Sequence, residues 1–161
     1  KNCNLMLSVP IRCDGQIDAE ERLIVEAIGA WLGKNGAAIY GSRPWRVFGE
    51  GPTQVGGGSM NEGGNDTAYT PQDVRYVTKG GRLYALVLGW PKDARVRLTM
   101  LGADRPVAHG AVEAVTLADG TALAFARKGD ALEVTLPERA RDPLGVAIAI
   151  AGKGIAQGLV A

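Results

Sequence analysis

The spacing of apolar residues changes along this sequence, and that change constrains the fold more than any other feature. Apolar residues first recur at helical spacing in one stripe, which consists of Leu23, Ile24, Ala27, Ile28, Trp31 and Leu32. From about residue 70 onward they instead alternate with polar residues. The first pattern predicts an amphipathic helix and the second a series of β-strands. We therefore expect one α/β piece followed by an all-β domain.

A short apolar run precedes the helical stripe. Residues 4–9 read Asn-Leu-Met-Leu-Ser-Val, which is typical of a strand buried on both faces in a parallel sheet. Asp18, with Glu21 three residues later, predicts the start of the helix, and Gly36 is expected to end it in the left-handed conformation. Residues 1–36 thus indicate half of a βα repeat. A parallel strand needs neighbours and a one-sided helix needs a sheet, so their partners are expected upstream.

The second half of the chain carries hairpin signals. Gly80-Gly81 separates two alternating runs, and Asp119-Gly120 and Gly129-Asp130 mark two further turns. Residues 83–88 are apolar on both faces and predict a central strand. The Gly-rich segment 49–65 is expected to be a linker or a long surface loop. About seven short strands with turns between them favour an antiparallel β-sandwich.

The charge balance, the lengths of the apolar runs and the cysteine positions argue against a nucleic-acid or membrane partner, a membrane-spanning segment and a disulfide. The 161 residues include 18 basic and 17 acidic side chains, so the net charge of +1 gives no case for a nucleic-acid or anionic-membrane partner. The apolar runs are far shorter than the ~18 residues that cross a bilayer. Cys3 and Cys13 flank the expected strand, which would hold them beyond the ~7 Å reach of a disulfide, so both are expected to be free thiols.

Four groups of residues occur in an order and at a spacing that resemble those of a known family. They are Asn4-Leu5-Met6-Leu7-Ser8-Val9 with Asp14-Gly15-Gln16-Ile17; Ala38-Ile39-Tyr40-Gly41-Ser42-Arg43-Pro44-Trp45; Gly49-Glu50-Gly51-Pro52; and Asp73-Val74-Arg75-Tyr76-Val77-Thr78-Lys79-Gly80 with Leu83-Tyr84-Ala85 and Leu88-Gly89-Trp90-Pro91. Together they resemble the end of the catalytic barrel and the following domain in family 29 glycoside hydrolases, the α-L-fucosidases. The resemblance implies a mostly β fold, an antiparallel β-sandwich preceded by the last βα unit of a (β/α)8 barrel. Residues 1–46 would supply the last strand, helix and connector of the barrel, and residues 47–161 the C-terminal sandwich.

The same resemblance implies a function for a parent enzyme. Such an enzyme hydrolyses terminal α-L-fucosyl residues by a retaining mechanism, which uses two carboxyl groups about 5–5.5 Å apart. Both are expected upstream, so this chain is expected to hold no catalytic residue, to be inactive alone, and to complete and brace the barrel. No metal or organic cofactor is implied, and His109, the only histidine, has no ligand spacing around it.

Expected partners follow from the same resemblance. They are a fucosylated glycan or glycoside bound through the parent barrel, the upstream (β/α)8 domain itself, and a second copy of the chain in a homo-oligomer. The resemblance favours a secreted or periplasmic location.

Five residues are candidates for a site, each with a structural alternative. Ser8, Arg12 and Asp14 would lie at the barrel mouth, where they line the rim of the sugar pocket or only shape the loop. Ser8 stands where many family members have Asn. Arg43 and Trp45 would stack on a sugar or pack at the domain interface. An alternative function is a non-catalytic carbohydrate-binding β-sandwich module, which would need a strip of exposed aromatic side chains.

Overall fold

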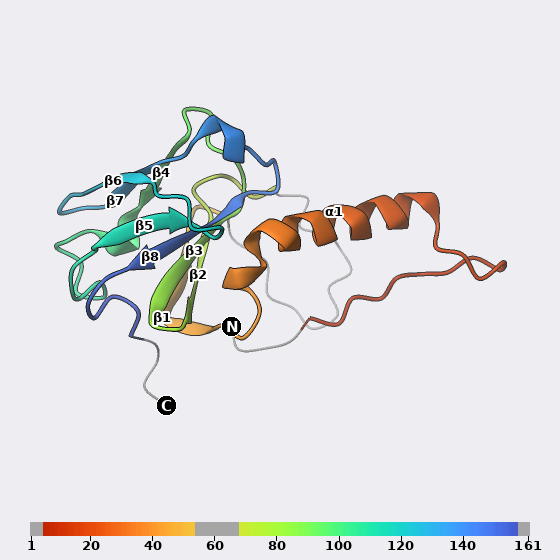
Figure 1. Ribbon diagram of the computed structural model, residues 1–161, viewed down its shortest axis with the longest axis horizontal. Coiled ribbons are helices and arrows are strands. Elements are labelled where there is room, and N and C mark those ends of the chain that lie inside the picture. The colour runs from red at the N-terminus through yellow and green to blue at the C-terminus, as the bar shows by residue number, and fades with distance from the viewer. Residues whose placement is uncertain (1–4, 54–67, 158–161) are drawn as a thin grey trace.

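The computed structural model describes residues 5–53 and 68–157, which form a β-sandwich with one long helix beside it (Figure 1). The helix α1 spans Ala19–Asn35, and three 3₁₀ turns follow along the chain: η1 (Gly36–Ala38), η2 (Thr99–Leu101) and η3 (Glu138–Ala140). The strands in these residues are β1 (Arg43–Glu50), β2 (Val74–Lys79), β3 (Arg82–Val87), β4 (Arg95–Leu98), β5 (Ala114–Leu117), β6 (Ala124–Arg127), β7 (Leu132–Thr135) and β8 (Val146–Ala151). No helix in this described part is long and apolar enough to cross a membrane.

Two antiparallel sheets form the sandwich. The larger sheet has the order β1-β2-β3-β8-β5 and the smaller one β4-β7-β6. Inward side chains of both sheets fill one core, in which Trp45 and Tyr76 from the larger sheet join Leu98 and Leu132 from the smaller. The predicted sandwich is therefore confirmed, as is the central position of β3, which pairs with β2 on one side and β8 on the other.

The predicted hairpins form where the glycines indicated them. Gly80 and Gly81 both have positive φ, at 57° and 76°, which is the backbone of a tight two-residue turn that follows the twist of β2 and β3. Asp119-Gly120 turns the chain back after β5, so that Ala122 bridges to β5. Gly129-Asp130 lies between the paired strands β6 and β7.

Helix α1 begins as predicted and ends differently. The Asp18 carboxylate accepts a hydrogen bond from the amide of Glu20 at 3.1 Å and caps the first turn. The prediction that Gly36 is left-handed is wrong, because its φ is −60° and the chain continues into η1. The left-handed glycine comes later, at Gly41. A Cβ at Gly36 would lie 2.8 Å from the ring of Tyr40, so a side chain there would require this exposed ring to move.

Only the last turns of α1 lie against the sandwich (Figure 1). Trp31 is half-buried against the outer face of the larger sheet, beside Tyr84 and Leu86. Leu23 and Ile24, nearer the start of the helix, are 67% and 53% exposed. The apolar stripe of the helix is thus only partly covered by this chain.

The strand predicted over residues 4–9 does not form in its described part, residues 5–9. Leu5, Met6 and Leu7 are all exposed there. A parallel strand is held by hydrogen bonds to its neighbours, and no described strand lies beside this segment. The structure therefore shows the sandwich and the helix but not a barrel unit.

Two further expectations concern the segments flanking these elements. The expected linker over residues 49–65 begins too early, because Gly49 and Glu50 belong to β1, and residues 54–67 lie outside the described part. Cys13 is a free, exposed thiol, while Cys3 lies outside the described residues. Strand β1 also runs across the expected boundary between residues 1–46 and 47–161. This division into two domains stays a prediction.

Candidate functional site at the junction of helix and sandwich

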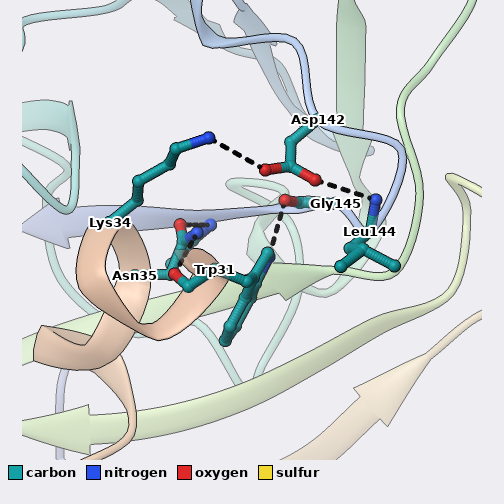
Figure 2. Close-up of polar contacts among 7 residues, drawn as sticks. Trp31, Lys34, Asn35, Asp142, Leu144 and Gly145 are labelled. Carbon is teal, nitrogen blue, oxygen red and sulfur yellow. Dashed lines mark hydrogen bonds and ion pairs between the residues drawn. The ribbon is translucent and has the colours of Figure 1, made fainter. Parts of the chain in front are cut away.

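Helix α1 is fixed to the sandwich by the side chains of its last turns (Figure 2). The indole Nε1 of Trp31 donates to the carbonyl oxygen of Gly145 at 2.9 Å. The side chain of Asn35 works in both directions: its Oδ1 accepts from the amide of Ala147 at 2.8 Å, and its Nδ2 donates to the carbonyl oxygen of Trp31 at 3.1 Å. Asn35 is 4% exposed, so these bonds are made away from water, where an unpaired polar group is costly.

The pairing of β5 with β8 explains why the backbone amide of Ala147 is available to Asn35. Strand β5 pairs with β8 only as far as Leu117 opposite Ile148, so β8 continues past the end of its neighbour. The amide of Ala147 therefore has no β5 residue opposite it, and the amide group of Asn35 takes that place. Small side chains at Ala147 and Ala149 let the end of the helix approach the sheet closely.

A groove of about 620 Å³ lies beside this junction, between the end of α1, the turn after β5 and residues 139–146. Lys34 Nζ lies 3.2 Å from the carboxylate of Asp142, which also accepts from the amide of Leu144. Asp119 also lines the groove, and a hydrogen bond from the Thr121 backbone lowers the pKa of its carboxyl group. The lining holds charges of both signs but no aromatic ring, histidine or cysteine, so it has neither a stacking surface for a sugar nor soft metal ligands.

Glu50 joins the two sheets through its carboxylate. It accepts from the Tyr76 hydroxyl at 2.6 Å on the larger sheet. It also accepts from the amides of Thr99 and Met100 at 3.0 Å each, and from the Thr99 hydroxyl, all in the turn that follows β4 of the smaller sheet. Burial, followed by the charge and hydrogen bond of Glu50, raises the pKa of Tyr76 well above its usual value. Glu50 therefore has a structural role.

Asp73 holds together two segments that are distant in sequence. It is completely buried, and its carboxylate accepts from the amide and hydroxyl of Thr53 at 3.0 and 2.8 Å and from those of Thr70 at 2.7 and 2.8 Å. Burial raises the pKa of this carboxyl group, but the hydrogen bonds from Thr70 and Thr53 outweigh burial and bring it down to about 2. Gly51 must lack a side chain here, because a Cβ would lie 2.4 Å from Asp73 Oδ1.

The candidate residues Ser8, Arg12 and Asp14 lie together on the exposed loop before α1. Asp14 Oδ1 accepts from the amide of Gln16, and the Arg12 amide donates to the carbonyl oxygen of Gln16, so these two residues shape the turn. None of the three has a described contact with the groove at the helix junction. Their role at a sugar rim stays a prediction.

The stacking interpretation of Trp45 is wrong. Its ring is 1% exposed, packs edge-on against Tyr76 with centroids 5.1 Å apart, and donates through Nε1 to the carbonyl oxygen of Ile155 at 3.0 Å. A ring enclosed in the sandwich core has no face free for a sugar. Arg43 is exposed, and its guanidinium bonds to the carbonyl oxygen of Ser42, so its role stays open.

No group of three or more metal-ligating side chains gathers anywhere in residues 5–53 and 68–157. Sequence reasoning missed Asn35, Glu50 and Asp73, the three polar residues that hold the parts of this chain together. The sequence signal for two of them was present in Gly49-Glu50-Gly51. A Cβ at Gly49 would lie 2.4 Å from the carbonyl oxygen of Val74, and a Cβ at Gly51 would touch Asp73, so both glycines mark close backbone contacts.

Comparison with known proteins identifies similar domains. A family model described as "Alpha-L-fucosidase C-terminal domain" matches residues 65–151, more than half of the chain. The tissue alpha-L-fucosidase of Rattus norvegicus is 37% identical over 97 residues, which are 59% of this chain and 17% of that protein. The human tissue alpha-L-fucosidase is 35% identical over 97 residues, 59% of this chain and 16% of that protein.

Solved structures show the same fold. The alpha-fucosidase of Thermotoga maritima, in complex with a mechanism-based inhibitor, matches with a TM-score of 0.65 and 24% identity over 92% of this chain and 30% of that chain. A family 29 alpha-L-fucosidase of Bacteroides thetaiotaomicron matches with a TM-score of 0.53 and 18% identity over 88% of this chain and 27% of that chain. The present chain thus spans less than a third of each of these relatives.

Proposed function

The chain belongs to the family of α-L-fucosidase C-terminal domains, and from this premise we propose that it completes and braces the catalytic barrel of a retaining α-L-fucosidase. The parent enzyme would hydrolyse terminal α-L-fucosyl residues. Its nucleophile and its acid/base would be two carboxyl groups about 5–5.5 Å apart, both supplied by the barrel. The chain itself would contribute α1 to the barrel surface and hold that helix with the sandwich.

The observation that carries this proposal is the uneven distribution of exposed apolar side chains. Of the 15 large apolar side chains that are exposed in the described residues, all but Phe125 and Leu144 belong to residues 5–69. An apolar surface gathered in one part of a chain is typical of a protein–protein contact. The apolar stripe of α1 and the segment before it would be covered by the barrel.

The roles of the acidic residues are consistent with catalysis elsewhere. The carboxylate of Asp73 is enclosed by four donors, and that of Glu50 also accepts four hydrogen bonds. Asp18 caps α1 and Asp119 closes the turn after β5. Each of these four carboxylates is thus engaged in a structural hydrogen bond.

A chromogenic α-L-fucoside tests the proposal. We expect no turnover by the 161-residue chain, and turnover by the native polypeptide that carries this sequence, with a mass larger by at least the ~250 residues of a barrel. Turnover by the chain alone would place catalytic residues within it. A native polypeptide near 16.8 kDa would exclude a barrel in the same chain.

The alternative of a carbohydrate-binding module has weaker support. Such a module would need a flat row of exposed aromatic rings, but Trp45 is buried and Phe125 lies alone on β6 of the smaller sheet. The exposed rings of Phe48 and Tyr69 both lie against a guanidinium group instead of forming an open platform.

A further inference from the structure

An exposed cluster of two aromatic rings and one arginine lies at the β1 edge of the larger sheet. The guanidinium carbon of Arg75 lies 4.9 Å from the ring centroid of Phe48 and 5.5 Å from that of Tyr69. The two rings are 51% and 46% exposed. We call Phe48, Tyr69 and Arg75 the arginine–aromatic cluster.

Hydrogen bonds hold this cluster in place. Arg75 Nη1 donates to the carbonyl oxygen of Val74 at 3.0 Å and approaches that of Glu50 at 3.4 Å. The guanidinium is therefore fixed between the two rings before any partner arrives. A surface that is already ordered loses little conformational entropy on binding, and aromatic and arginine side chains are the ones most enriched at contact hot spots.

Basic side chains outnumber acidic ones along the strands that carry the cluster. Strands β1 and β2 and the hairpin after them carry five cations, which are Arg43, Arg46, Arg75, Lys79 and Arg82. None of the five forms an ion pair with a described carboxylate. The one acid of these strands, Glu50, is directed to the smaller sheet.

The cluster shares a face of the sheet with α1. Along β2, Tyr76 faces the sandwich core, whereas Val77 faces outward and packs against the same outer apolar cluster as Trp31 of the helix. Arg75 precedes Val77 by two residues and so lies on the same outer face. The helix end and η1 cover the β3 and β8 part of this face, and the cluster occupies the β1 and β2 part.

We propose that the arginine–aromatic cluster is a second contact between this domain and the catalytic barrel, and that it receives an apolar surface rimmed by acidic side chains. This inference rests on the proposed function and adds a specific docking surface to it. The barrel is the occupant because the cluster continues the outer face on which α1 lies, while the opposite sheet has a single exposed large ring, Phe125. The relatives extend far beyond the length of this chain and so supply a further region to occupy the surface.

Hydroxyl-radical labelling of side chains tests this contact directly. The 161-residue chain and the native full-length polypeptide are labelled under identical conditions, and modification is quantified at Phe48 and Tyr69. Phe125, on the opposite sheet, is the internal control. We expect labelling of Phe48 and Tyr69 to fall at least fivefold in the full-length polypeptide, with labelling of Phe125 unchanged.

Labelling of Leu23 and Ile24 on α1 distinguishes a failure of this inference from a failure of the proposed function. If Leu23 and Ile24 are protected in the full-length polypeptide but Phe48 and Tyr69 are not, the second contact is wrong and the bracing role of α1 stands. If none of the four is protected, the proposed function fails as well. Concentration-dependent protection of Phe48 in the 161-residue chain alone would assign the cluster to self-association and overturn the inference.

A matched pair of variants gives an independent measurement. Phe48→Ser should lower the melting temperature of the full-length polypeptide by several degrees and leave that of the 161-residue chain nearly unchanged, since the ring is already half exposed there. Phe125→Ser is the control and should affect both forms alike. Equal effects of Phe48→Ser on the two forms would contradict a barrel contact.

Discussion

The side-chain oxygen of Asn35 lies 2.8 Å from the amide nitrogen of Ala147, and this hydrogen bond extends the ladder of β8 beyond the last residue of β5. Helix α1 is thereby tied to β8, the strand next to the β5 edge of the larger sheet, through a residue that is itself buried.

Replacing Asn35 by Ala should destabilise the chain by about 1–3 kcal/mol, because the buried amide of Ala147 loses its partner. Lys34→Ala is the matched control on the same turn. It removes the ion pair with Asp142, but the lysine side chain is 67% exposed, so the expected loss is below about 1 kcal/mol. Urea denaturation of both variants measures the difference, and equal losses would contradict the anchoring role of Asn35.

Gly51→Ala and Gly29→Ala should act in opposite directions. Gly51 has a φ of 128°, and an added Cβ would lie 2.4 Å from Asp73 Oδ1, so alanine is expected to cost about 3 kcal/mol or more. Gly29 lies within α1 with open space around it, and alanine there should stabilise by up to about 1 kcal/mol. Thermal unfolding of the two variants checks both signs, and a neutral Gly51→Ala would contradict the close contact.

Asp73 should make the chain sensitive to acid. The pKa of this buried carboxyl group is lowered from 3.8 to about 2, so its ionised form stabilises the fold at all pH values above about 4. That stability, roughly 2 kcal/mol, is lost as the pH falls from about 4 through about 2. Stability curves at pH 2 to 7 should therefore be steeper at the acid end for the wild type than for Asp73→Asn, which is less stable near neutrality. Parallel curves would exclude Asp73 as a source of the acid sensitivity.

Glu50→Gln should weaken the joint between the two sheets. Four donors converge on the carboxylate, and an amide group presents one NH₂ where an acceptor is needed, so we expect a loss of about 2–4 kcal/mol. Glu113→Gln, in the exposed stretch before β5, is the control and should change stability by less than about 0.5 kcal/mol. Chemical denaturation distinguishes the two, and similar values would contradict the role of Glu50.

Local chemistry predicted the parts of the fold that depend on neighbours in sequence. The turn at Gly80-Gly81 and the start of α1 at Asp18 need only the backbone preferences of one or two residues, and both formed as expected. The pattern of β3, apolar on both faces, correctly indicated a strand with a neighbour on each side.

The failures involve partners that no local pattern specifies. The run at residues 5–9 has the composition of a buried strand, but a strand forms only where another strand supplies hydrogen bonds. The sequence placed Trp45 on a connector, at a sugar or at the domain interface, because the pairing of β1 with β2 depends on residues about thirty positions away. Glu50 and Asp73 resembled ordinary motif residues, since their donors at Thr99 and Thr53 are 49 and 20 residues distant.

Because α1 is attached to the sandwich only near its C-terminal end, a small rotation at that end produces a larger displacement at the start of the helix. At 1.5 Å per residue the 17 residues of α1 extend about 25 Å from the anchor, so a tilt of about 10° at Asn35 would move the first turn by about 4 Å. Small errors at the joint would thus be magnified at Arg12 and Asp14, on the loop that leads into the far end. The angular stiffness of the contacts made by the half-buried Trp31 and the buried Asn35 therefore sets how accurately that loop is placed.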